Sequence, residues 1–179
     1  MDAITQWDLS ILDALQGCRI PFLDRVLSAV THLGDHGVFW ILFALALLCI
    51  PRTRRLGVCV ALALILDLLL CNVLIKPLVA RPRPYALREI ELLIDAPKDF
   101  SFPSGHAAAA FAAASALALR RSRLTVPALL LALVICFARL SLYVHYPTDV
   151  LAGIFLGCLC GILSWLLCRR LPSENQASK

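Results

Sequence analysis

Long apolar stretches, each ended by a short polar or basic cluster, constrain the fold of this 179-residue chain more than any other feature. They cover residues 37–50, 57–75, 104–119, 124–143 and 147–167. A helix needs about 20 mainly apolar residues to cross a bilayer. The whole chain is 60% hydrophobic with a mean hydropathy of +0.83, whereas an ordinary soluble domain is roughly 45–50% apolar. We therefore predict an all-α transmembrane bundle of five to six spans.

The segment before these stretches has apolar residues at helical spacing but is interrupted by charges. The charged residues are Asp13, Arg19, Asp24 and Arg25. Gly17 and Pro21 divide the segment into two short helices. Charges at this density are costly at the centre of a bilayer. We expect an amphipathic hairpin that lies at the membrane interface, and a poor first span is the alternative.

The length leaves room for no separate soluble domain, so we expect residues 1–179 to form one domain. Within it we expect an interfacial hairpin at 1–33, a transmembrane bundle at 34–170 and a polar tail at 171–179. The N-terminus lacks the basic region of a cleavable signal peptide, so later helices are expected to direct insertion.

Basic clusters occur at alternate ends of the apolar stretches. Their members are Arg52, Arg54, Arg55, Arg120, Arg121, Arg123, Arg169 and Arg170. The positive-inside rule places these ends in the cytoplasm. We therefore expect a protein of the cell (inner) membrane in which loop 76–102 and the turn around His145 face the extracytoplasmic side. The clusters are too short for the basic run of a nucleic-acid-binding protein, so no nucleic acid partner is expected.

Cysteines do not indicate a metal site, although the chain contains eight of them. No spacing among them resembles a zinc site. Most lie in or beside apolar stretches, where cysteine packs as a small hydrophobe. We expect no bound metal from these residues.

The first polar cluster, at residues 76–84, leaves the second apolar stretch. It contains Lys76, Arg81 and Arg83, and prolines at 82 and 84 hold the chain in an extended conformation. Alternate residues then point the same way. Taken alone, this cluster is equally well explained as a positively charged interfacial anchor.

The second cluster is Pro103-Ser104-Gly105-His106, at the start of an alanine-rich stretch. Ser104 is a natural N-cap. Unpaired N–H groups at a helix N-terminus bind anions, and glycine allows a ligand to approach the backbone closely. Capping explains Ser104 without a ligand, but it does not explain His106 at the mouth of a membrane helix.

The third cluster combines Arg139 with His145 and Asp149 around the start of the last apolar stretch. The helix dipole alone would favour Asp149 in a first turn. Its carboxylate can also accept a hydrogen bond from one ring nitrogen of His145, which leaves the other nitrogen free to attack. If the spans form one bundle, all three clusters meet at one end of it.

In order and spacing, these clusters resemble the three-part signature of the type 2 phosphatidic acid phosphatase (PAP2) superfamily, over about residues 57–161. Its K-x6-R-P part is matched by Lys76 and Arg83-Pro84, its P-S-G-H part by residues 103–106. The S-R-x5-H-x3-D part is matched at residues 139, 145 and 149. Ala138 replaces the usual serine, which removes a supporting hydroxyl. Arg81-Pro82 offers a second register for the first part, but only Arg83 has the family spacing.

The resemblance implies a phosphohistidine mechanism without metal or cofactor. His145 would attack phosphorus, Asp149 would orient it, and His106 would protonate the leaving oxygen. The groups that would bind the phosphate are Lys76, Arg83, Ser104, Gly105 and Arg139.

A site at the bilayer rim favours a phosphate carried on a lipid, such as undecaprenyl diphosphate, phosphatidylglycerol phosphate or phosphatidic acid. Alternatives are a lipid phosphotransferase that uses the same site, and a non-catalytic protein that binds lipid head groups. A metal site made of His106, His145 and Asp149 is disfavoured because the nearby cations would repel the metal. Vanadium haloperoxidases share the anion site but are soluble and larger. Asn72 is expected to support the site from one turn below Lys76, and Asp67 to pair within the bundle.

Overall fold

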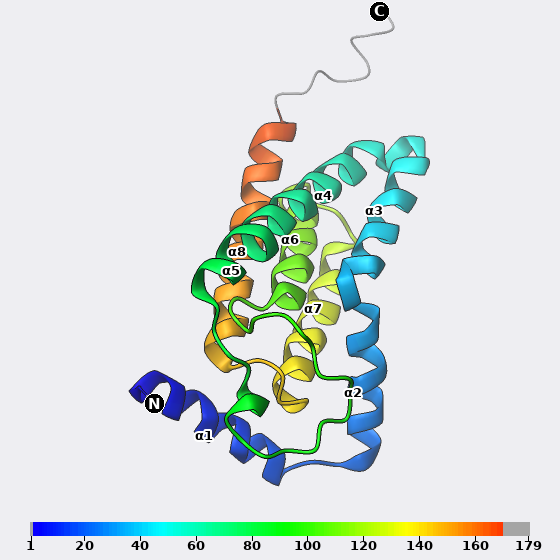
Figure 1. Cartoon of the computed structure of the whole chain (residues 1–179). Helices are drawn as coiled ribbons and strands as arrows, with labels where there is room; N and C mark the ends of the chain where they lie inside the picture. Colours follow the sequence, from blue (N-terminus) through cyan, green and yellow to red (C-terminus); the bar gives the residue numbers. More distant parts are fainter. Residues whose placement is uncertain (1, 170–179) are drawn as a thin grey trace, which may run out of the picture.

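Helices form the regular structure of the computed structural model, which describes residues 2–169 (Figure 1). In chain order they are α1 (Ala3–Gly17), α2 (Pro21–Leu33), η1 (Asp35–Gly37), α3 (Val38–Cys49), η2 (Pro51–Thr53), α4 (Arg54–Asp67), η3 (Leu68–Ile75), α5 (Lys76–Val79), η4 (Pro84–Ala86), α6 (Gly105–Leu119), α7 (Thr125–Ser141) and α8 (Pro147–Cys168). No strand occurs within residues 2–169, so the predicted all-α fold is confirmed. The polar tail predicted at 171–179 lies outside the described residues.

The apolar helices coincide with the apolar stretches of the sequence. Two segments, Pro51–Ala86 and Pro147–Cys168, contain helix that is long and apolar enough to cross a bilayer, and α3, α6 and α7 are shorter apolar helices. Large apolar side chains remain exposed along the outside of these helices, including Val73 (63%), Val126 (65%) and Phe155 (74%). Such a surface suits contact with lipid. How many helices cross the membrane stays a prediction.

The second predicted span extends further than the sequence indicated. Helix α4 continues through the π-helical segment η3 into α5, so Lys76 lies inside a helical rod and not at the start of a loop. The rod ends at Ala80, whose backbone is left-handed (φ 48°). Pro82 then prevents the helix from resuming. The helical course fixes Lys76 relative to the bundle.

The two short N-terminal helices form as predicted, with the break between Gly17 and Pro21. Helix α1 crosses the end of the bundle that is opposite the α3–α4 turn, and α2 runs beside α7 before leading into α3 (Figure 1). Asp8 of α1 is fully buried. The N-terminal segment is therefore packed into the protein through at least one polar side chain, and its place relative to the membrane stays a prediction.

Helices α6 and α8 make the most extensive helix contact of the bundle. Small residues allow it: α6 buries a series of alanines, and α8 faces them with Gly153, Gly157 and Gly161. A methyl group added at Gly153 would lie 2.5 Å from the carbonyl oxygen of Ser104. Small residues of this kind let helix backbones approach closely in membranes. The contact sets the start of α6 beside the start of α8, and the Ser104 amide donates to the Asp149 carbonyl oxygen at 3.0 Å.

Replacement of Gly157 by alanine tests this packing. The added methyl group would lie 2.3 Å from the carbonyl oxygen of Ala108, so α6 and α8 would have to separate. Overpacking of this kind costs about 1–3 kcal/mol. We expect a lower Tm in thermal unfolding of the purified protein in detergent. Gly17→Ala is the control, because a methyl group there meets nothing within 4 Å; equal Tm values for the two variants would contradict the packing account.

Candidate active site

A cavity of about 900 Å³ extends from the end of the bundle away from the basic turns along helices α3 and α4. Its walls contain residues from all three polar clusters. Those that the sequence predicted are Lys76, Arg83, Gly105, His106, Arg139 and His145. Ser104 and Asp149 are fully buried and lie behind the wall. The structure therefore places six of the eight predicted site residues around one space and the other two next to it.

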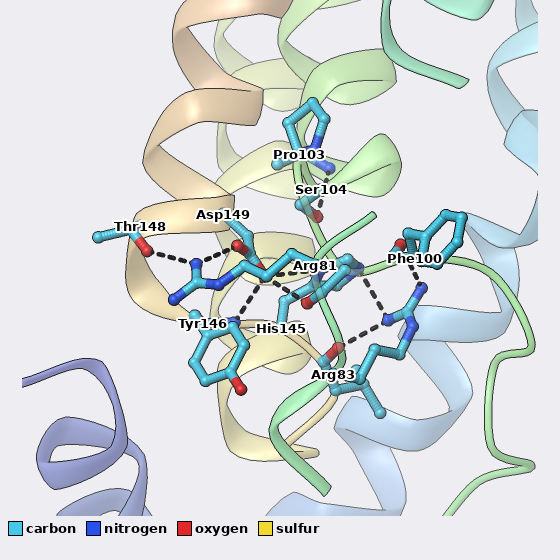
Figure 2. Close-up of polar contacts among 12 residues, drawn as sticks. Arg81, Arg83, Phe100, Pro103, Ser104, His145, Tyr146, Thr148 and Asp149 are labelled. Carbon is cyan, nitrogen blue, oxygen red and sulfur yellow. Dashed lines mark hydrogen bonds and ion pairs between the residues drawn. The ribbon is translucent and has the colours of Figure 1, made fainter. Parts of the chain in front are cut away.

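Arg83 is fixed by contacts on several sides, and its side chain is 4% exposed. Its Nε donates to the Asp99 carbonyl oxygen at 2.9 Å, and its Nη1 donates to the Val144 carbonyl oxygen at 2.6 Å. Nη1 also lies 3.2 Å from Nε2 of His145 (Figure 2). The extended backbone between two prolines gives Arg83 the direction that these contacts need. A positive charge thus stands beside the outward ring nitrogen of His145.

The second cluster starts helix α6 as predicted, with Ser104 as the N-cap. Its hydroxyl accepts from the Ala107 amide at 3.5 Å. At Gly105, a methyl group would lie 3.1 Å from Oδ1 of Asn72 and 3.8 Å from Nζ of Lys76. The backbone at Gly105 is therefore close to the Lys76 ammonium, and a larger residue there would crowd this corner of the cavity.

His106 extends from the first turn of α6 into the cavity. Its Nε2 lies 3.2 Å from Oδ1 of Asp35, and Oδ2 of Asp35 lies 2.8 Å from Nδ1 of His32. Partial burial alone would raise the pKa of Asp35, but the hydrogen bond from His32 and the nearby His106 outweigh it and lower this pKa. A carboxylate from the short turn before α3 thus faces His106.

Arg139 and His145 are almost fully buried, at 2% and 1% exposure. Nη1 of Arg139 donates to the Thr31 hydroxyl of α2 at 2.8 Å. Nδ1 of His145 lies 3.5 Å from Oδ2 of Asp149 and has no hydrogen-bond partner among residues 2–169. The expected hydrogen bond between His145 and Asp149 is therefore not formed, and the two groups are in contact only at ion-pair distance.

The reason is that Oδ2 of Asp149 is already engaged. It accepts from the Ser101 hydroxyl and from the Tyr146 amide, the latter at 3.0 Å. The Tyr146 contact belongs to the capping of α8. Asp149 therefore caps helix α8. Its carboxylate also lies at ion-pair distance from the His145 ring.

Burial and positive charge control the protonation of His145. Burial, followed by the charges of Arg83, Arg139 and Lys76, lowers the pKa of His145 well below its ordinary value of 6.5. The ring is thus neutral near pH 7. A neutral imidazole has a free lone pair, which is the form that can act as a nucleophile.

Asp99 of the long loop occupies the cationic side of the cavity. Its carboxylate accepts from Nζ of Lys76 and, at 2.6 Å, from Nη2 of Arg83. Burial would raise the pKa of Asp99, but the hydrogen bonds and charges of these two cations hold it well below its usual range. An anion is therefore already bound where the sequence predicts that phosphate binds.

Several functional neighbours were missed by sequence reasoning. Asp99, Ser101 and Asp35 lie in loops or turns without a local pattern that would single them out, and Asp8 belongs to a segment interpreted as interfacial. Their signal is a long-range contact, which one sequence does not reveal. Asp67 and Asn72 line the cavity. Oδ1 of Asp67 has no hydrogen-bond partner within the described part of the chain, so the predicted pairing is not made by that atom. Among residues 2–169, no three His, Cys, Asp or Glu side chains are grouped so that they could hold a metal ion.

The cavity changes character along its length. Beyond Lys76 and His106 its walls are mainly apolar side chains of α3, α4 and the first residue of η3. These are Ile41, Ala44, Leu45, Leu48, Ala61, Leu64, Ile65 and Leu68. One space therefore joins a cationic pocket with two imidazoles to an apolar groove between two helices.

Comparison with known proteins agrees with this arrangement. The family model described as PAP2 superfamily matches residues 52–172. The chain is 33% identical over 165 residues to decaprenylphosphoryl-5-phosphoribose phosphatase of Mycobacterium tuberculosis, which covers 87% of this chain and 88% of the relative. It is 32% identical over 148 residues to undecaprenyl-diphosphatase of Sulfolobus acidocaldarius, which covers 82% of this chain and 71% of the relative.

A solved structure shares the fold. The transmembrane PAP2-type phosphatidylglycerolphosphate phosphatase of Bacillus subtilis superposes with a TM-score of 0.78 and 26% sequence identity. The match covers 97% of this chain and 90% of the other. Similarity thus extends over the helices that carry all three clusters.

The position of Asp99 leads to a prediction about anion binding. Asp99→Asn removes the carboxylate that competes for Lys76 and Arg83. We expect inorganic phosphate to bind about tenfold more tightly, which corresponds to about 1.4 kcal/mol. Isothermal titration calorimetry in detergent measures this. Asp95→Asn is the control, because Asp95 lies in the same loop and lines the same cavity; unchanged or weaker phosphate binding by Asp99→Asn would contradict the competition.

Proposed function

The chain belongs to the PAP2 superfamily and is a phosphatase, and we propose that its substrate is a phosphate carried on a membrane lipid. One observation carries the proposal: the cavity that contains both imidazoles and the cations continues as an apolar groove between α3 and α4. A phosphate fits the first part by charge, and a hydrocarbon chain fits the second by burial of apolar surface.

Among lipids, we propose a polyprenyl-linked phosphate as the preferred substrate. The similarity to the decaprenylphosphoryl-5-phosphoribose phosphatase and to the undecaprenyl-diphosphatase supports this class over phosphatidic acid. Phosphatidylglycerol phosphate stays in the same proposal as a second candidate, supported by the Bacillus subtilis structure.

We place the site at the extracytoplasmic face of the inner membrane, with five helical spans in the bundle. The distribution of basic residues supports this orientation. The turns with Arg52, Arg54 and Arg120 lie at the end of the bundle opposite the two imidazoles and the cations of the cavity, and basic turns prefer the cytoplasm.

In the proposed reaction, Nε2 of His145 attacks phosphorus, and the bond from phosphorus to the lipid oxygen breaks. Nε2 is the candidate atom because it lies beside Arg83, whereas Nδ1 lies against Asp149. His106 donates a proton to the departing oxygen. The Asp149 carboxylate stabilises the imidazolium that forms at His145.

Cations would hold the phosphate oxygens during this step. Lys76, Arg83 and Arg139 supply positive charge, and the amides at Gly105 and His106 supply donors at the N-terminus of α6. The Ser104 amide is already bonded to the Asp149 carbonyl oxygen, so Ser104 contributes as the N-cap of α6. The substrate phosphate would displace the Asp99 carboxylate from Lys76 and Arg83. Water then attacks the phosphohistidine, His106 takes the proton from that water, and inorganic phosphate leaves.

Removal of the proposed nucleophile is the first test. We expect His145→Ala to lower phosphate release from polyprenyl phosphate lipids in detergent about a thousandfold or more, because the proposed phosphohistidine can no longer form. The Tm of the variant shows that it is folded. Turnover within tenfold of the unaltered protein by a folded variant would end the proposal.

The apolar groove predicts the order of substrates. Polyprenyl-linked phosphates should have a higher kcat/KM than phosphatidic acid, and both should exceed a water-soluble phosphomonoester that cannot use the groove. A purified-enzyme screen that measures released phosphate compares them. Equal kcat/KM for the soluble ester and the lipids would contradict the role of the groove.

The lowered pKa of His145 predicts the pH dependence. Attack needs the neutral ring, and a group with a lowered pKa stays neutral to a lower pH. The acid limb of kcat/KM should therefore lie well below pH 6.5, the ordinary value. A pH profile in detergent measures it; loss of activity already at or above pH 6.5 on the acid side would contradict a neutral His145 in the free enzyme.

A further inference from the structure

Arg81 makes direct contact with the carboxylate next to His145. Its Nη1 donates to Oδ1 of Asp149 at 2.5 Å, on the opposite oxygen from the one that faces His145 (Figure 2). The Ser101 hydroxyl and the Tyr146 amide hold that other oxygen. Both oxygens of Asp149 are therefore engaged, and Arg81 supplies the positive charge.

The guanidinium of Arg81 is itself held in one orientation. Nη2 donates to Oδ2 of Asp8 at 2.8 Å, and Nη1 donates to the Thr148 hydroxyl at 2.8 Å. Its central carbon lies 3.8 Å from the centre of the Tyr146 ring. A planar group with bonds at its edge and a ring against its face has little freedom to turn.

Asp8 connects this arrangement to the N-terminal helix. Its carboxylate is fully buried and accepts from the Thr148 amide at 3.0 Å and from the Thr148 hydroxyl at 2.5 Å. Asp8 thus caps the first turn of α8 from α1 while it pairs with Arg81. One guanidinium lies between two fully buried carboxylates, Asp8 and Asp149.

We propose that Arg81 and Asp8 are positioning residues of the reaction: they hold the Asp149 carboxylate turned toward His145. The inference rests on the proposed function, in which His145 becomes an imidazolium. Without Arg81, the Asp149 carboxylate would lose the charged donor on Oδ1 and could turn away from His145. A carboxylate turned away would stabilise the imidazolium poorly.

The expected effect is on turnover more than on substrate binding. The imidazolium at His145 forms only along the reaction, so loss of its partner lowers kcat and leaves KM nearly unchanged.

The test compares Arg81→Gln, Arg81→Lys and Asp8→Asn in the full chain, in detergent, with a polyprenyl phosphate lipid. We expect Arg81→Gln and Asp8→Asn to lower kcat about 10–100-fold, which is typical when a hydrogen-bond partner of a functional side chain is removed. KM should stay within about twofold of the KM of the unaltered protein. Arg81→Lys should recover part of kcat, because lysine restores the positive charge but not the several hydrogen bonds that a planar guanidinium makes at once.

Asp13→Asn is the matched control on the same helix. Oδ1 of Asp13 accepts from the Tyr143 hydroxyl at 2.5 Å, so it also fastens α1 to the end of the bundle, through a different contact. We expect activity near that of the unaltered protein. Equal loss in Asp13→Asn and Asp8→Asn would overturn the inference, because docking of α1 alone would explain both.

A rise in KM with unchanged kcat in Arg81→Gln would also overturn it, because Arg81 would then bind substrate directly. So would an unchanged kcat in both Arg81→Gln and Asp8→Asn. If Arg81→Gln does not fold, Asp8→Asn and Arg81→Lys make the same comparison. Failure of the proposed function is separate, since His145→Ala would then retain turnover.

Discussion

The burial of positive charge at one end of an apolar bundle is the constraint on which the rest of this structure depends. Lys76, Arg83 and Arg139 are each less than a tenth exposed, and like charges in a medium of low dielectric constant repel strongly unless an anion lies among them. Asp99 supplies that anion for Lys76 and Arg83. The same charges, together with burial, keep His145 neutral. A site built in this way suits a phosphate dianion, and the same electrostatic cause keeps the proposed nucleophile neutral.

Much of the fold and of the site could be predicted because the evidence is local in the sequence. Long continuous apolar stretches favour helices in a membrane, since a helix satisfies every backbone hydrogen-bonding group within its own segment. The residues around Lys76, His106 and His145 stand at the ends of such stretches, and the spacing within each cluster is short. Ser104 illustrates the local rule most simply: an N-cap is determined by the residues that immediately follow it, and α6 begins where the sequence predicts.

The remaining features depend on contacts between distant segments. Asp8 accepts a hydrogen bond from the amide of Thr148, which is 140 residues away in the sequence. Nothing in the N-terminal sequence indicates that the Asp8 carboxylate is buried. The continuation of the helix past Lys76 depends on a π-helical segment that periodicity does not reveal. The expected hydrogen bond between His145 and Asp149 is absent, whereas the Tyr146 amide, which caps α8, and the Ser101 hydroxyl both donate to the carboxylate. These are tertiary effects, and they explain why composition and spacing locate the site but not its supporting contacts.

A structure of the full chain in lipid nanodiscs with bound orthovanadate would test the central claim most directly. Vanadate adopts the five-coordinate shape of a phosphoryl group under attack, so it reports which groups surround a single phosphorus. The account predicts vanadium bonded to Nε2 of His145, with His106 at the opposite apical oxygen, the Lys76, Arg83 and Arg139 side chains on the equatorial oxygens, and the Asp99 carboxylate displaced. Vanadate bound elsewhere, or bound in this cavity without contact to both imidazoles, would contradict it.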